Sequence, residues 1–257
     1  QVLHDISENF DVKFDLTARE KVTRADFIGR DLVIVLGGDG TLTSISHNID
    51  ADTPVIGVNS HPIEDYPNGS FGFYMDSDVH TFGEDIVTAL KGEAIINEIP
   101  RLQAIIDTTS GNRFTTDPAM NDLLIANTHQ YAPSKYHLRR DGKKCRQQSS
   151  GIVFSTWLGQ GAWLNHILEE ETLEKLRNKV DYAEINSHYF VVSREISHAQ
   201  RDENPWSWFD WTDQDTVLTS DMHRGYVVPD GWDEVHFNRG ASITGPLNYA
   251  FLHLENQ

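Results

Sequence analysis

The pattern of apolar and polar residues changes along the chain near residue 98. Before that point, uninterrupted apolar runs at 32–36 and 54–59 are typical of strands buried on both faces. Helix-compatible sequence separates them at 41–48, and another helix is expected over 79–91, where a Lys-Gly pair forms a stop signal. This strand–helix–strand order predicts a parallel α/β domain over residues 1–98.

The first thirty residues are expected to contribute three smaller elements. Apolar residues at helical spacing predict an amphipathic helix at the start, and a short extended piece follows at 12–14. A second helix is expected over 18–28.

From residue 99 onward, short alternating runs are separated by turn residues, which predicts a predominantly β domain over residues 99–257. One helix is expected within it, over 161–178, with charged residues on a solvated face. Strands are expected at 101–107, 123–127, 136–140, 151–156, 189–194, 216–220, 226–228 and 235–238.

The first apolar run ends in the sequence Gly-Gly-Asp-Gly-Thr, residues 37–41. Glycine permits positive φ and close approach of the backbone to a ligand, and a strand followed by a loop and a helix N-terminus suits phosphate. A loop that only holds anions should not carry a carboxylate, so Asp39 points to a metal or a proton and hence to phosphoryl transfer. A tight turn is the plainer interpretation. Neither a Walker-type loop nor Gly-x-Gly-x-x-Gly after a strand occurs.

Composition narrows the possible partners. The 257 residues carry a formal charge of −18, from 39 acidic and 21 basic residues, so we expect binding to neither nucleic acid nor an anionic membrane. A phosphate site must then be built from backbone amides, a metal or a few basic side chains. The single cysteine, Cys145, excludes an internal disulfide and favours a cytoplasmic location. The twelve histidines lack paired-ligand spacing, so no metal-ligating residues are assigned.

Three further segments could bind a nucleotide. Phe71, Phe73 and Tyr74 lie among glycines and could form a stacking platform or simply pack in a core. Asn121-Asp122 precedes an apolar run and could hold the vicinal hydroxyls of a ribose or form a turn. Residues 149–163 predict a strand, a turn of small residues and a helix start, which is a second place for backbone to approach a ligand.

Taken in order, these segments resemble the NAD kinase family. The family pattern contains Gly-Gly-Asp-Gly-Thr, then Gly-Val-Asn followed by a Gly-Phe pair, then Asn with an acidic residue, then a Gly-containing strand and turn ending in Ala and an aromatic residue. Residues 192–196 and 226–241 resemble the mitochondrial-type branch and its bacterial relatives. Gly-Gly-Asp-Gly-Thr by itself also occurs in lipid kinases of the diacylglycerol or sphingosine type.

The resemblance implies an activity. It implies Mg²⁺-dependent phosphorylation of the 2′-hydroxyl on the adenosine ribose of NAD, with ATP or polyphosphate as the donor, which produces NADP. Asp39 would act as the general base, or would position the hydroxyl and the metal. Phosphates would be bound by Gly37, Gly38, Gly40 and Thr41, and NAD by Phe73, Tyr74, Asn121, Asp122, Ala162 and Trp163.

The resemblance also implies an architecture. It implies a homodimer or homotetramer, a C-terminus that packs back on the first domain, and a first strand upstream of residue 1.

The chain departs from the family pattern at three places. Ser150 replaces a family Asp, residues 157–161 lose two hydroxyl side chains, and about eight extra residues follow Gly-Val-Asn at 60–67. These changes motivate one alternative, a nucleotide-binding regulator without catalysis, and the shared loop motivates another, a lipid kinase. The choices between ATP and polyphosphate and between NAD and NADH are not determined by the residues.

Overall fold

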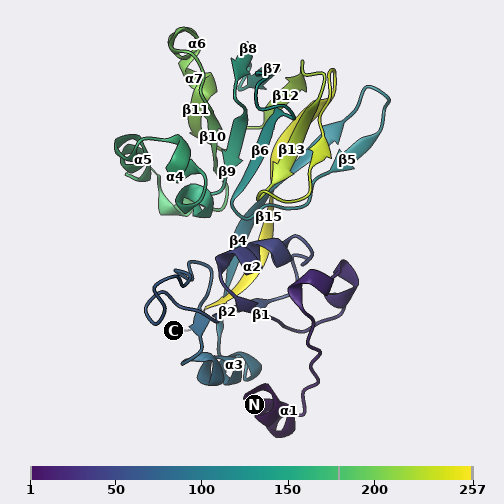
Figure 1. Ribbon diagram of the computed structural model, residues 1–257, viewed down its shortest axis with the longest axis vertical. Helices are drawn as coiled ribbons and strands as arrows, with labels where there is room; N and C mark the ends of the chain where they lie inside the picture. Colours follow the sequence, from purple (N-terminus) through teal and green to yellow (C-terminus); the bar gives the residue numbers. More distant parts are fainter. Residues whose placement is uncertain (1, 179, 256–257) are drawn as a thin grey trace. The chain divides into compact units, whose positions relative to one another are not determined.

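The computed structural model describes residues 2–178 and 180–255. The chain divides into two compact units, one made of Gln1–Ile99 with Ala250–Gln257 and the other of Pro100–Tyr249. The chain leaves the first unit within strand β4 (Ile95–Asp107) and returns to it within β15 (Ser242–Glu255) (Figure 1).

The first unit is built on a parallel sheet. Strand β1 (Val33–Gly37) pairs with β2 (Val55–Asn59) in the register Val33↔Val55 to Gly37↔Asn59. Strand β3 (Ser77–Asp78) and the end of β15 both pair with β2, also in parallel. All five residues of β2 are buried, as its continuous apolar pattern predicts. The predicted parallel α/β arrangement is confirmed.

The described residues of this unit include three α-helices, α1 (Val2–Phe10), α2 (Asp39–Ser46) and α3 (Phe82–Leu90). The helix expected over 18–28 is wrong, because two short 3₁₀ turns occupy it, η1 (Arg19–Lys21) and η2 (Arg24–Asp26). The Asp26 carboxylate accepts hydrogen bonds from the backbone N–H and the hydroxyl of Thr23, at 2.7 and 2.9 Å. These bonds hold Thr23 in an extended conformation, with φ of −131° and ψ of 164°, so they interrupt the expected helix at this residue.

The described residues of the second unit contribute strands to two β-sheets. In one sheet the order is β5 (Arg113–Thr115), β4, β15, β12 (Thr216–Ser220), β7 (Ser134–Arg140) and β8 (Lys143–Ser149). In the other it is β11 (Phe209–Thr212), β10 (Tyr189–Ser193), β9 (Ile152–Ser155), β6 (Asp122–Asn127), β13 (Gly225–Pro229) and β14 (Val235–His236), and every neighbouring pair is antiparallel. The predicted β character of this half is confirmed.

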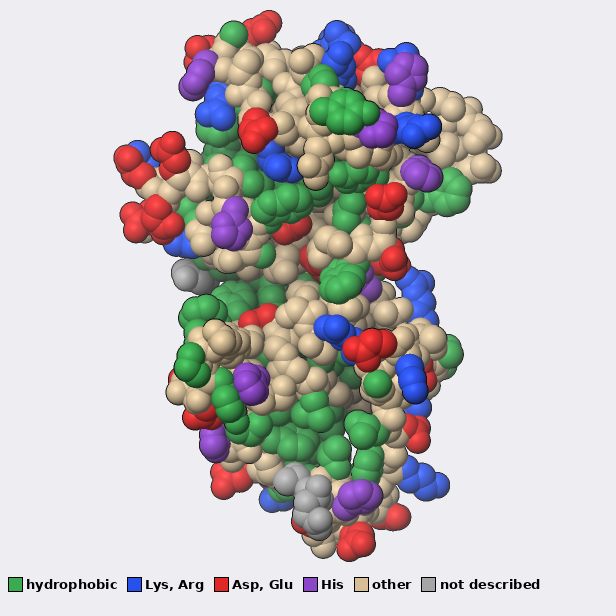
Figure 2. Space-filling model, viewed as in Figure 1, with side chains coloured by type: hydrophobic (Ala, Val, Ile, Leu, Met, Phe, Trp, Pro, Cys, Tyr) green, Lys and Arg blue, Asp and Glu red, His purple; other side chains and the backbone are tan. Residues whose placement is uncertain are grey.

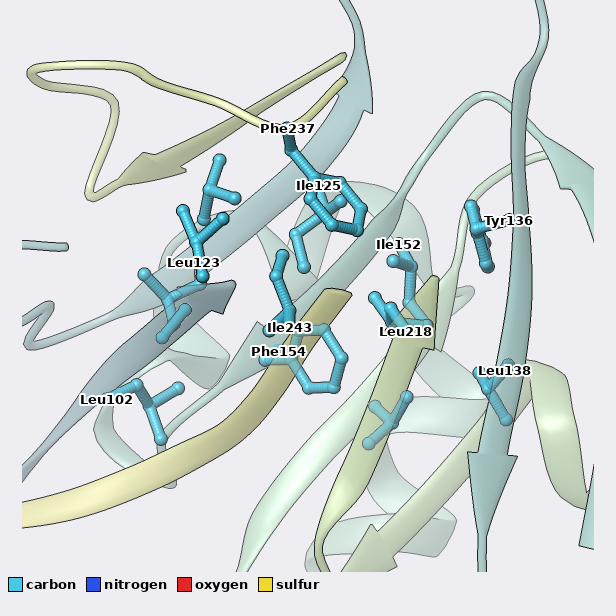
Figure 3. Packing of buried hydrophobic residues seen from close by; sticks show 14 of the residues in the cluster. Leu102, Leu123, Ile125, Tyr136, Leu138, Ile152, Phe154, Leu218, Phe237 and Ile243 are labelled. Carbon is cyan, nitrogen blue, oxygen red and sulfur yellow. The ribbon is translucent and has the colours of Figure 1, made fainter. Parts of the chain in front are cut away.

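The core of the second unit lies between these sheets. Buried side chains from β4, β7, β12 and β15 contact buried side chains from β6, β9, β10 and β13. Figure 3 shows Leu218 and Leu138 of one sheet together with Ile152 and Phe154 of the other. Along β7 buried and non-buried residues alternate, so one face of that strand points into the core.

A hairpin turn at Asp141-Gly142 joins β7 to β8. Asp141 and Gly142 have φ of 47° and 69°, and Arg140 pairs with Lys143 across the turn. Positive φ at both central residues is the geometry that an Asp-Gly pair favours.

The helix expected over 161–178 is wrong in extent, because it is two helices, α4 (Leu164–Ile167) and α5 (Glu170–Arg177). Leu168 and Glu169 are extended between them, with ψ of 144° and 143°. The break lets Leu164 of α4 and Leu173 of α5 both pack in the cluster around Trp157. The remaining helical elements are η3 (Leu158–Gly161), η4 (Tyr182–Glu184), α6 (His198–Glu203) and α7 (Pro205–Trp208).

The polar face of α5 is exposed, and acidic side chains gather over this helix in the space-filling view (Figure 2). Among the described residues, none of the helices is both long enough and apolar enough to span a bilayer.

Candidate functional site

Asp39 is the first residue of α2, directly after β1 and the glycine pair. Strand β1 ends at Gly37, and Gly38 is the extended N-cap of the helix. The Gly38 carbonyl accepts hydrogen bonds from the N–H groups of Thr41 and Leu42, at 2.8 and 3.3 Å. The loop is therefore as short as a strand-to-helix connection allows, and it places Asp39 at the positive end of the helix dipole.

The glycines of this loop provide space rather than unusual backbone angles. Positive φ is not found at Gly37, Gly38 or Gly40, contrary to the conformational freedom expected of them. A Cβ on Gly37 would lie 2.4 Å from the Thr41 Oγ1, and one on Gly38 would lie 2.8 Å from the Ser70 Cβ. A Cβ on Gly40 would meet no described atom within 4 Å. Gly37 and Gly38 thus permit close packing, whereas Gly40 borders open space.

The carboxylate of Asp39 is half-buried and has a defined orientation. Its Oδ1 accepts a hydrogen bond of 2.8 Å from the backbone N–H of Tyr74, and its Oδ2 accepts one of 3.0 Å from the hydroxyl of Ser70. Each oxygen keeps a further lone pair for a proton, a hydroxyl or a metal ion.

Sequence reasoning missed two residues that support Asp39, namely Ser70 and Asn59. The side chain of Asn59 is buried, donates to the Ser70 carbonyl at 3.0 Å and accepts from the His61 N–H at 3.1 Å. Both residues lie inside the two glycine-containing segments singled out from the sequence. The glycine-containing segments therefore indicated where the site lies, but no feature of the neighbouring sequence identified Ser70 and Asn59 as the residues that support Asp39.

The proposed aromatic platform separates into exposed and buried parts. The side chains of Phe71 and Phe73 are 81% and 62% exposed, whereas that of Tyr74 is only 5% exposed. The rings of Phe73 and Tyr74 meet edge to face, with centroids 5.1 Å apart. The buried ring of Tyr74 therefore packs against the ring of Phe73, whereas its contact with Asp39 is made by the backbone N–H.

In the second unit, Asn121 and Asp122 form the turn that enters β6. The Asn121 carbonyl accepts hydrogen bonds from the Thr156 N–H at 2.9 Å and from the Ser155 hydroxyl at 3.1 Å. A Cβ on Gly159 would lie 2.2 Å from the same oxygen, so this position requires glycine. The first turn of the 157–161 segment thus packs directly under Asn121.

Asp122 is 5% exposed, and its pKa is raised to about 7 by burial and then by the negative charge of Asp230. Asp230 is a further residue that sequence reasoning missed. Its carboxylate accepts hydrogen bonds from the main-chain N–H groups of residues 120–122.

Ala162 and Trp163 follow η3, and both are half-buried. Trp163 packs on the cluster of Leu124, Ala126 and Val153, and the Arg194 guanidinium lies 4.9 Å from the centroid of its ring. The exposed part of the Trp163 ring is therefore held in place from two sides.

At the Ser150 departure, the hydroxyl donates a hydrogen bond to the Glu195 carboxylate. Both residues line a pocket of about 650 Å³ in the second unit, together with Tyr131 and Gln200.

Within the described part of the chain, no three His, Cys, Asp or Glu side chains are grouped so as to hold a metal ion. Asp39 is a single carboxylate with open lone pairs. That fits a cation such as Mg²⁺, which takes one or two protein carboxylates and fills its other positions with substrate phosphates and water.

Comparisons with known proteins agree with the sequence resemblance. Residues 5–94 match the family model of the ATP-NAD kinase N-terminal domain. The NAD kinase of Clostridium perfringens is 26% identical over 141 residues, which is 54% of this chain and 47% of the relative. The NAD kinase of Lachnospira eligens is 30% identical over 135 residues, 52% of this chain and 43% of the relative. The matched part thus spans about half the length of these curated relatives.

Two solved structures share the fold over nearly the whole chain. The NAD kinase from Archaeoglobus fulgidus in complex with ATP has a TM-score of 0.70 at 14% identity, covering 99% of this chain and 88% of its own. The yeast NADH kinase complexed with NADH has a TM-score of 0.70 at 16% identity, covering 98% and 72%. The first unit is therefore similar in sequence to the N-terminal domain of the NAD kinase family, and the chain shares the fold of these two solved structures.

Proposed function

We propose that this protein is an NAD kinase, which transfers the terminal phosphoryl group of ATP to the 2′-hydroxyl of the adenosine ribose of NAD and so makes NADP. The observation that carries the proposal is the Asp39 carboxylate, held by the Tyr74 N–H and the Ser70 hydroxyl at the N-terminus of α2. A fixed carboxylate beside a helix N-terminus suits a reaction that needs both a proton acceptor and an anion site.

Asp39 would accept the proton of the 2′-hydroxyl while the oxygen of that hydroxyl bonds to the terminal phosphorus of ATP. The bond from that phosphorus to the bridging oxygen breaks, and ADP leaves with the electron pair. Phosphates would be held at Gly37, Gly38, Gly40 and Thr41, where the open space beside Gly40 supports close approach to the helix N-terminus. Asp39 would also contact the Mg²⁺ ion that is bound with ATP. When bound, this ion would neutralise part of the phosphate charge.

Asn121 and Asp122 would bind the ribose hydroxyls of NAD and orient the acceptor. The bases would contact Phe73, Ala162 and Trp163, with Tyr74 supporting the Phe73 ring. The exposed ring of Phe73 and the braced ring of Trp163 support this assignment, because flat apolar faces stack well on nucleotide bases.

We infer three further properties of the protein. Motif resemblance in residues 192–196 and 226–241 supports membership of the mitochondrial-type branch. A single cysteine supports a cytoplasmic location. The aromatic residues of the 206–211 segment support a homodimer or homotetramer, because Trp and Phe are enriched at subunit interfaces. Light scattering coupled to gel filtration measures the last property directly.

The decisive experiment is an assay of NADP formation with NAD or NADH as acceptor and ATP or polyphosphate as donor, in the presence of Mg²⁺. A diacylglycerol acceptor tests the lipid-kinase alternative in the same format. Replacing the proton acceptor in Asp39→Asn should lower kcat by about 10²–10⁴-fold. The exposed Asp52, in the same unit, is the matched control, and Asp52→Asn should leave kcat unchanged.

If the unaltered protein binds NAD but forms no NADP with either donor, the proposal is wrong and the non-catalytic regulator is favoured. Phosphorylation of diacylglycerol in place of NAD would favour the lipid kinase.

A further inference from the structure

The Asp230 carboxylate binds three consecutive main-chain N–H groups that lie more than a hundred residues earlier in the chain. Its Oδ2 accepts from the Met120 N–H at 2.7 Å, and its Oδ1 accepts from the N–H groups of Asn121 and Asp122 at 2.8 and 3.0 Å. The Asp230 N–H in turn donates to the Asp122 carbonyl at 2.9 Å. Hydrogen bonds to an ionised carboxylate are roughly twice as strong as neutral ones, so this grip on the turn is firm.

We propose that Asp230 is a positioning residue of the NAD site, which holds the side chains of Asn121 and Asp122 in the orientation that binds the ribose hydroxyls. The inference rests on the proposed function and adds a residue to its site. Asp230 itself would not contact the substrate; it would act through the main chain of residues 120–122.

The opposite side of the same turn is also held. The Thr156 hydroxyl donates to the Met120 carbonyl at 2.6 Å, and the Thr156 N–H donates to the Asn121 carbonyl at 2.9 Å. Asp230 takes the N–H groups of the turn and Thr156 takes its carbonyls. The main chain of the turn is therefore fixed from both sides before any ligand arrives, which lowers the ordering cost of binding.

The backbone conformation at Asp230 does not by itself explain the aspartate. Asp230-Gly231 has φ of 47° and 78°, nearly the same as Asp141-Gly142 with 47° and 69°. Asp141 is exposed, and within the described structure its side chain makes no hydrogen bond. An Asp-Gly turn thus forms without side-chain hydrogen bonds to a distant segment. The three hydrogen bonds of Asp230 are therefore not needed for the turn itself.

Asp230 also places a negative charge beside the buried Asp122. Burial raises the pKa of Asp122 to about 7, with the Asp230 charge as the second cause. The residue paired with Asp122 on β9 is Ser155, and the neighbours on either side of the turn are Asn121 and Thr156, none of which is charged. Removing the Asp230 charge should therefore lower the pH at which Asp122 ionises.

The test compares Asp230→Asn with the matched control Asp141→Asn. Asparagine tolerates the same left-handed backbone but is uncharged and has one acceptor oxygen in place of two. For Asp230→Asn we expect kcat/KM for NAD to fall at least tenfold, while KM for ATP stays within twofold and the acid limb of the kcat/KM profile moves to lower pH. Asp141→Asn should match the unaltered protein in all three quantities.

Asp230→Gly is the second variant, because glycine keeps the left-handed backbone freely and removes every acceptor. It should lose more kcat/KM for NAD than Asp230→Asn does. Equal losses for NAD and ATP, or an acid limb that does not move in Asp230→Asn, would overturn the proposal in favour of a purely structural role.

The failure of this inference is distinguishable from a failure of the proposed function. If the unaltered protein makes no NADP, the kinase assignment fails. The Asp122 carboxyl can then be titrated by carbon NMR in the unaltered protein and in Asp230→Asn. A lower pKa in the variant supports the electrostatic part of the inference, and an unchanged pKa contradicts it.

Discussion

The hydroxyl of Ser70 connects the N-terminus of α2 to the loop that contains Gly72. It donates to the Asp39 carboxylate at 3.0 Å and accepts from the N–H groups of Asp39 and Gly72, at 3.4 and 3.2 Å. If the Ser70 hydroxyl were removed, the Asp39 carboxylate could rotate away from the position in which it accepts a proton. Small misplacements of catalytic groups lower the reaction rate substantially.

Ser70→Ala should therefore lower kcat for NADP formation by about tenfold, less than Asp39→Asn does, because the Tyr74 N–H still binds Asp39. Steady-state kinetics with saturating ATP measures this. Ser60→Ala is the matched control, since Ser60 lies in the same loop and is exposed. Equal kcat in Ser70→Ala and the unaltered protein would mean that the hydroxyl does not orient Asp39.

The ionisation of Asp122 should make the stability of the protein depend on pH. Its pKa is about 7 in the folded protein against 3.8 for an ordinary aspartate, mainly because it is buried. A raised pKa means that the folded state binds the proton more tightly than the unfolded state does. The resulting stabilisation is complete below about pH 4 and is lost as the pH rises through 7.

Asp122→Asn should consequently melt several degrees above the unaltered protein at pH 8, and the difference should shrink towards pH 4. Melting curves followed by circular dichroism across this range test the sign. A difference that does not depend on pH would contradict the assigned pKa.

At the scale of elements, the β1–α2 connection separates two roles of glycine. A Cβ at position 38 would collide with Ser70, whereas one at position 40 would collide with no described atom. Gly40 also lies within α2, where alanine is favoured over glycine by about 1 kcal/mol.

Gly38→Ala should therefore lower the melting temperature, while Gly40→Ala should leave it unchanged or raise it. If phosphates approach the helix at Gly40, the same Gly40→Ala variant should raise KM for ATP several-fold. Thermal unfolding and ATP kinetics on the two variants separate packing from ligand space. A Gly40→Ala enzyme with unchanged KM for ATP would place the phosphates elsewhere.

Elements of the second unit could be predicted where the local sequence has a clear hydrophobic pattern or strong turn residues. The strand expected at 216–220 matches β12. The Asp-Gly pair at 141–142 is a strong local signal for a hairpin, because both residues tolerate positive φ. Strand β8 was missed because its sequence is mostly charged and polar, with only a few residues facing the core. The helix over 161–178 was drawn too long because the break at Leu168 carries neither glycine nor proline.

At the scale of the whole molecule, the first unit is completed by residues from the far end of the chain. Strand β15 returns from the second unit, and His253 pairs in parallel with Val55 of β2. Unpaired N–H and C=O groups at the edge of a buried strand are costly, so the last residues should stabilise the first unit.

A chain truncated after Tyr249 should therefore show earlier unfolding and faster proteolysis of residues 1–99 than the full chain. The second unit should keep its protection, because its core lies within 100–249. Limited proteolysis with mass spectrometry distinguishes the two units. Equal protection of residues 1–99 in both chains would show that the β15 pairing adds no stability.

The sequence by itself determined the features that short stretches encode: the buried parallel strands, the glycine connection with Asp39, the Asn121-Asp122 turn and the β character of the second half. Each depends on periodicity or on residues with strong local preferences. Only the tertiary structure decided what orients these side chains. Ser70 and Tyr74 reach Asp39 across 31 and 35 residues, and Asp230 reaches Met120 across 110. Hydrogen bonds over such separations arise from packing of distant segments, which no local pattern of residues records.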